Sequence, residues 1–72
     1  LGEVAMAVAR VTKVTAASTR SFDDAVNQGL KRAAKTLRGI TGLEVVEMKA
    51  KVERGKITEY RSTMELTFLL ED

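Results

Sequence analysis

The spacing of apolar residues along the chain predicts three strands and one helix. Alternation of apolar and polar residues indicates strands, and apolar residues every three to four positions indicate a helix. Residues 8–15 are rich in β-branched side chains, which favours a strand, although Val11 and Val14 fall on opposite faces of it. A bulge, or burial of both faces, would account for that imperfect alternation. Residues 16–20 are small and polar, so a loop is expected there.

A helix is predicted over residues 22–38. Ser21 and Asp24 fit a capping box with Asp in place of the usual Glu, at the positive end of the helix dipole. Gly39 supplies a stop signal after the last basic turn. Apolar residues recur at helical spacing in between, at Phe22, Val26, Leu30, Ala33 and Leu37.

Two alternating segments follow, at residues 43–53 and 57–70, and Gly55 marks a tight hairpin between them. The element order is therefore β-α-β-β, an α+β arrangement. The residues expected on the core side of these two strands are Val46, Met48, Ala50, Val52, Tyr60, Met64, Leu66, Phe68 and Leu70.

Length and composition restrict the function. The chain has 72 residues and a formal charge of +2, with no Cys and no His, so disulfides, thiolate metal sites and histidine catalysis are excluded. The chain starts at Leu1 and Met6 is a plausible native start, so residues 1–5 are set apart as non-native or disordered and 6–72 are expected to form one domain. No leader or long apolar stretch is visible, which favours a cytoplasmic protein without membrane partners.

Self-association is expected from the dimensions of the elements. Each hairpin strand would be roughly 37 Å or longer, whereas the helix would span about 26 Å. One helix cannot cover such a sheet, and a chain this short buries little of its surface alone. A bare monomer with a strongly coiled sheet is the alternative.

Four segments, in order and at matching spacing, resemble the dodecin family. They are Ser-Phe-Asp-Asp-Ala-Val at 21–26, Ala-Ala-Lys-Thr-Leu-Arg-Gly-Ile at 33–40, Glu-Val at 44–45 and Gly-Lys-Ile-Thr-Glu-Tyr-Arg at 55–61. The resemblance covers about residues 8–71. It implies a three-stranded antiparallel sheet wrapped around one helix, and a hollow homo-dodecamer. It also implies a non-catalytic protein that binds or stores flavin (riboflavin, FMN or FAD).

Two positions depart from the flavin-binding pattern that the resemblance implies. Gly42 stands where flavin-binding dodecins place a Trp that stacks on the ring, and Arg61 stands where they place a Gln that contacts the polar edge. Glycine offers no stacking surface, and arginine has donors only. We therefore expect weak flavin binding at these cofactor-site positions. Arg61 could instead hold a phosphate or carboxylate, or form an ion pair with Glu59 or Glu47.

Glu47 is the candidate metal ligand. The resemblance implies that it faces symmetry-related copies, where a ring of carboxylates could hold Ca²⁺ or Mg²⁺. A pair with Lys49 or Arg61 is the alternative. Glu44 is expected on the opposite face of the same strand.

The sequence gives little support for catalysis or for nucleic-acid binding. No Ser lies beside a candidate base, so an enzyme is not expected. Nucleic acid is not an expected partner, because no aromatic residue interleaves the basic helix end at Lys31, Arg32, Lys35 and Arg38. The leading hypothesis is a dodecin-like oligomer that sequesters a small ligand. The alternative is an ion-binding or purely structural dodecamer.

Overall fold

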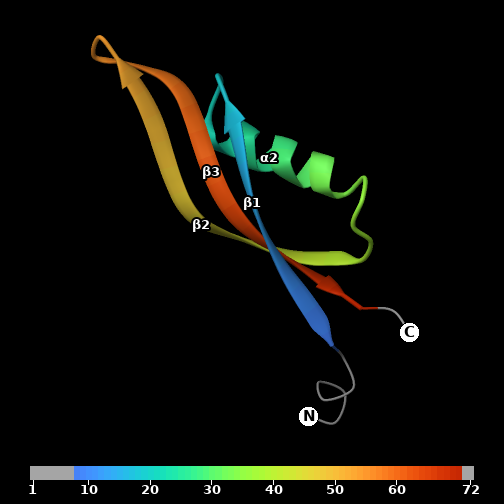
Figure 1. Ribbon diagram of the computed structural model, residues 1–72. Helices are drawn as coiled ribbons and strands as arrows, with labels where there is room; N and C mark the ends of the chain where they lie inside the picture. Colours follow the sequence, from blue (N-terminus) through green and yellow to red (C-terminus); the bar gives the residue numbers. More distant parts are fainter. Residues whose placement is uncertain (1–7, 71–72) are drawn as a thin grey trace.

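The computed structural model describes residues 8–70, which form one helix against a three-stranded antiparallel sheet (Figure 1). The elements are β1 (Ala9–Ser18), α2 (Phe22–Ala33), β2 (Ile40–Glu53) and β3 (Lys56–Leu69). The strand order is β1-β3-β2, so the last strand lies in the middle of the sheet. The expected β-α-β-β order is confirmed. The prediction for residues 1–5 lies outside the described residues.

Strand β1 is longer than its sequence pattern predicted. The expected loop at residues 16–20 is wrong at its start, because Ala16, Ala17 and Ser18 continue the ladder with β3. No register shift interrupts this pairing. Val11 and Val14 do lie on opposite faces, as predicted, without a bulge. Val14 packs against the core, whereas Val11 is exposed.

The helix is shorter than predicted, ending at Ala33 instead of residue 38. The N-terminal cap is confirmed, since the Asp24 amide donates to the Ser21 hydroxyl at 2.9 Å. After the helix, the amides of Lys35 and Thr36 bond to carbonyls three residues back, which tightens the last turn. Leu37 still packs on the core, so the helical spacing of apolar residues extends past the end of the regular helix.

The hairpin forms as predicted, and β2 contains irregularities that alternation alone did not reveal. Arg54 and Gly55 both have positive φ, 54° and 77°, as a two-residue hairpin turn requires. Register shifts occur between Ile40 and Gly42, between Val45 and Glu47, and between Lys51 and Val52. The strands run from 40 to 53 and from 56 to 69, in place of the predicted 43–53 and 57–70.

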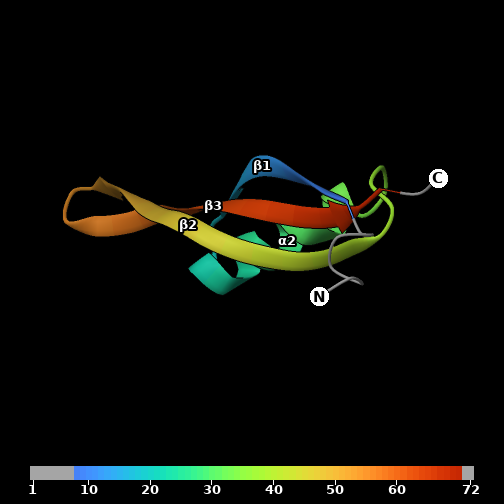
Figure 2. The same cartoon turned by 90° about the horizontal axis from the view of Figure 1, so that it is seen from below.

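The sheet has two different faces, which we call the helix face and the open face (Figure 2). Met64 and Leu66 of β3 are fully buried on the helix face, as predicted, and Ser62 beside them donates to the carbonyl of Phe22 at 3.2 Å. The partly buried residues around this core are Val14, Ala16, Val26, Leu30, Leu37, Ile40 and Leu43. Leu70, expected in the core, is exposed beyond the end of β3. The β2 residues expected on the core side are also exposed: Val46, Met48, Ala50 and Val52.

The β2–β3 hairpin projects beyond the rest of the chain (Figure 1). Strand β1 ends at Ser18, opposite Tyr60, so residues 51–59 form a two-stranded arm with no third strand. The chain is correspondingly elongated, measuring 55 × 24 × 13 Å. The expectation that one helix cannot cover the hairpin is confirmed.

Candidate functional site

All three predicted site residues lie on the open face of the sheet. Gly42 is opposite Thr67, and Glu47 is opposite Thr63. Arg61 has the same parity along β3 as these two threonines, so its side chain shares their face. The residues that the sequence predicted to bind a ligand therefore all lie on the face opposite the helix.

Two of the three residues line one shallow pocket, which we call the polar pocket. Its lining residues come from all three strands: Thr15, Glu47, Lys49, Arg61 and Thr63. Its volume is about 190 Å³. The hydroxyls of Thr15 and Thr63 share a hydrogen bond of 2.9 Å across the β1–β3 pairing. The sequence did not identify these threonines, because only the order β1-β3-β2 brings residue 15 beside residue 63.

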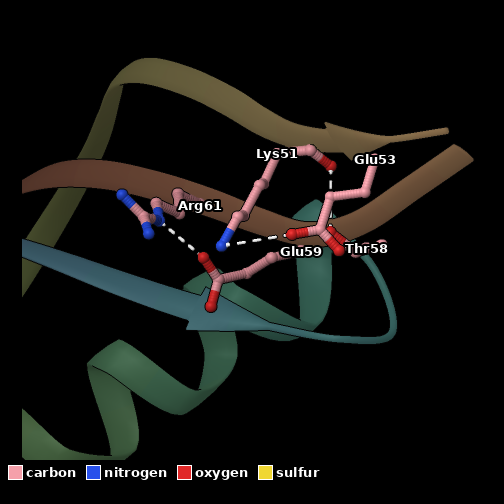
Figure 3. Close-up of polar contacts among 5 residues, drawn as sticks. All are labelled: Lys51, Glu53, Thr58, Glu59 and Arg61. Carbon is pink, nitrogen blue, oxygen red and sulfur yellow. Dashed lines mark hydrogen bonds and ion pairs between the residues drawn. The ribbon is translucent and has the colours of Figure 1, made fainter. Parts of the chain in front are cut away.

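Both charged candidates have ion-pair partners within the chain. The Arg61 Nε donates to Glu59 Oε1 at 2.7 Å, which confirms the predicted pairing (Figure 3). Glu47 Oε2 lies 3.6 Å from Lys49 Nζ, and these side chains are 53% and 70% exposed. Exposed pairs of this kind contribute about 0–1 kcal/mol. A ligand that offers better geometry can therefore displace either pair at little cost.

Charged pairs continue from the polar pocket into the arm. Lys51 Nζ lies 3.5 Å from Glu53 Oε2, and the Thr58 hydroxyl donates to the Lys51 carbonyl at 3.4 Å (Figure 3). Lys51 is opposite Glu59, so the open face of the arm alternates basic and acidic groups. Arg61 stands at the junction of this charged surface and the pocket.

Gly42 lies apart from the polar pocket. Its partner Thr67 is six residues from Arg61 along β3, which corresponds to about 20 Å. One chain therefore does not bring the two predicted cofactor positions together. A Cβ placed on Gly42 would lie 3.7 Å from the Thr67 Cβ, an ordinary van der Waals distance, so a Cβ fits at this position.

The aromatic residues all lie on the helix side of the sheet. The chain contains two Phe, one Tyr and no Trp. Phe22 and Tyr60 form an edge-to-face pair with ring centroids 5.1 Å apart, and Phe68 shares the face of Leu66. The open face, which carries Gly42 and Arg61, therefore has no aromatic ring from its own chain.

Glu44 lies on the same face as Glu47, so the expectation of opposite faces is wrong. The register shift between Val45 and Glu47 adds one residue to β2, and this restores Glu47 to the face that Glu44 occupies. Glu44 also lies directly opposite Glu65. Within residues 8–70, no three acidic side chains are grouped closely enough to hold a metal.

The basic helix end is separate from the polar pocket. Lys31 and Arg32 occupy the last turn of α2, where cations suit the helix dipole. The helix lies across the sheet from the open face (Figure 2). In the part of the chain that the structure describes, no helix is long and apolar enough to cross a membrane.

Comparisons with known proteins agree with this arrangement. The sequence model of the family Dodecin matches residues 8–71. A dodecin from Streptomyces davaonensis is 32% identical, with a TM-score of 0.86 over 92% of this chain and 97% of that one. A dodecin from Streptomyces coelicolor is 32% identical, with a TM-score of 0.87 over 92% and 94%. A calcium-chelating antigen, calcium dodecin from Mycobacterium tuberculosis, is 28% identical, with a TM-score of 0.77 over 89% and 91%. No curated protein sequence matches the chain.

Proposed function

The chain belongs to the dodecin family, and we propose that its ligand is a small anion held in the polar pocket, not a flavin stacked on an aromatic ring. The fold and the family support a hollow homo-dodecamer that binds a small ligand without catalysis.

The observation that carries the proposal is the absence of an aromatic ring from the open face of residues 8–70. The dodecin resemblance assigns the two flavin contacts to positions 42 and 61, which lie on this face. Gly42 offers no stacking surface there. The rings of Phe22 and Tyr60 pack against each other on the other side of the sheet. A flavin would lose its main apolar contact, worth ~1–3 kcal/mol for an aromatic ring against a base.

The polar pocket has donors suited to a carboxylate or phosphate. The Arg61 guanidinium can present a pair of parallel N–H groups, and the Lys49 ammonium adds a second positive charge. The two threonine hydroxyls can each rotate to donate. Glu59 and Glu47 now pair with these cations, and an incoming anion would take their place.

We further propose that the protein is not an enzyme. The pocket hydroxyls of Thr15 and Thr63 bond to each other, and neither is hydrogen-bonded to Glu47, the carboxylate of the pocket lining. Glu47 is paired with Lys49 instead. These groups bind and orient a ligand, which is the chemistry of a store or buffer.

The test is calorimetric titration of the assembled protein with inorganic phosphate, with acetate and with riboflavin. We expect phosphate or acetate to bind more tightly than riboflavin. Arg61→Gln should weaken anion binding about 10-fold or more, because it removes a charge-assisted contact. Arg38→Gln removes the same charge from an exposed residue between α2 and β2 that does not line the polar pocket, and it should leave binding unchanged. Riboflavin binding more tightly than both anions would contradict the proposal.

A second candidate ligand is Ca²⁺ or Mg²⁺, bound by Glu47 at a symmetry axis. The observation in its favour is that Glu44, Glu47 and Glu65 share one face, where the sequence had not placed Glu44. The similar protein from M. tuberculosis is described as calcium-chelating. Among residues 8–70 no three carboxylates lie together, so copies of Glu47 from neighbouring chains would have to complete the oxygen ligands.

The proposed partners are further copies of this chain and a small ligand, and neither a nucleic acid nor a membrane. The arginine and lysine side chains of the helix end are placed where the helix dipole already favours them. A cytoplasmic location remains a prediction from the sequence.

A further inference from the structure

Glu59 has two cations close to it, one on its own strand and one on the neighbouring strand. Its Oε1 accepts a hydrogen bond from Arg61 Nε at 2.7 Å, two residues along β3. Lys51 lies directly opposite Glu59 on β2, and the Cβ atoms of such facing residues are about 4.5–5.5 Å apart. Glu59 therefore stands between Arg61, which belongs to the polar pocket, and Lys51, which belongs to the arm (Figure 3).

Lys51 is held weakly by a different acid in this structure. Its Nζ lies 3.5 Å from Glu53 Oε2, and the two side chains are 58% and 57% exposed. The backbone of Lys51 is better fixed, because its carbonyl accepts from the Thr58 hydroxyl at 3.4 Å beside a register shift. Exposed pairs of this kind are weak, so Lys51 can exchange Glu53 for Glu59 by side-chain rotation alone.

We propose that Glu59 controls access to Arg61 by exchanging between these two cations. Without ligand it pairs with Arg61, and when an anion binds Arg61 it turns to Lys51. The exchange relieves the repulsion between Glu59 and the bound anion and gives the displaced carboxylate a new partner. A hollow of about 330 Å³, lined by Lys49, Ala50, Lys51 and Arg61, leaves room for the movement. This role of Glu59 rests on the proposed anion site, and it involves Lys51, which does not line the polar pocket.

The internal carboxylate lowers the affinity for any anion that uses Arg61. Glu59 is tethered beside Arg61, so it competes at a fixed effective concentration whatever the amount of ligand. Exposed ion pairs change an equilibrium constant by up to about 5-fold, and the side chains of Arg61 and Glu59 are 54% and 31% exposed. Lys51 offsets part of this loss, because it offers the displaced carboxylate a second partner. The effects of Glu59 and Lys51 on binding should therefore depend on each other.

Calorimetric titration of the assembled protein with inorganic phosphate tests the exchange. Glu59→Gln should bind phosphate about 2- to 5-fold more tightly, because the competing carboxylate is gone. Lys51→Gln should bind about 2- to 5-fold more weakly, because the displaced Glu59 has lost its second partner, whereas Lys51→Arg should bind like the unaltered protein. Combined with Glu59→Gln, Lys51→Gln should lose its effect. Lys56→Gln, which removes a cation opposite Glu53 on the same arm, is the matched control and should change nothing.

Two results would overturn the exchange. One is a Glu59→Gln variant that binds phosphate no more tightly than the unaltered protein. The other is an equal effect of Lys51→Gln with and without Glu59, which would mean that Lys51 acts only through its charge. Arg61→Gln separates this failure from that of the anion site. If Arg61→Gln weakens phosphate binding while either result is found, only the exchange is wrong, whereas an unchanged affinity in Arg61→Gln would refute the anion site itself.

Discussion

Replacing Gly42 by tryptophan should convert this chain into a better flavin binder. The site accepts a Cβ, since the nearest atoms to it would be the Thr67 Cβ at 3.7 Å and its Oγ1 at 4.0 Å. The backbone of Gly42 is not in the left-handed region, so no strain is expected. A new indole would stand on the open face, in the row that also contains exposed Val11.

The size of the gain follows from the stacking contact. An aromatic ring stacked on a base is worth ~1–3 kcal/mol, so the dissociation constant of riboflavin should fall about 5- to 150-fold. Quenching of riboflavin fluorescence measures this directly. Gly42→Ala is the control, because it adds a Cβ without a ring and should bind like the unaltered protein. The reasoning is refuted if the tryptophan variant binds no better than the alanine variant.

Three further predictions concern the core, the helix cap and the metal candidate. Leu66→Ala should lower the unfolding free energy by about 2–5 kcal/mol in thermal melts, because Leu66 is fully buried, whereas the exposed Leu69→Ala should cost little. Ser21→Ala should cost about 1 kcal/mol and speed hydrogen exchange at the Asp24 amide, which loses its acceptor. If Glu47 binds Ca²⁺, EDTA should lower the melting temperature of the native protein and added Ca²⁺ should restore it, while Glu47→Gln should respond to neither. Identical melting temperatures in every condition would contradict metal binding by Glu47.

Sequence periodicity predicted the elements well where one face is buried and the other exposed. The helix signal from Phe22 to Leu37 overshot Ala33 because a tightened turn keeps Leu37 on the core. The sequence pattern did not predict the end of β1, because small polar residues are typical of a loop. In the structure, Ala16 to Ser18 continue the pairing with β3.

The arrangement of the site was harder to predict than its members. Glu47 and Arg61 were named from the sequence, but their common pocket with Thr15 depends on β3 lying between β1 and β2. The extra residue in β2 before Glu47 reverses the face expected of Glu44 relative to it. A bulge of one residue leaves no clear mark in an alternating sequence pattern, so only the structure reveals it.

A native mass spectrum of the purified protein tests the central claim most directly, because it reports the number of chains and any retained ligand together. The account predicts a discrete species of twelve chains of 7.9 kDa, about 95 kDa, with no flavin mass attached. Monomers at micromolar concentration, or an assembly that retains riboflavin, FMN or FAD, would contradict it.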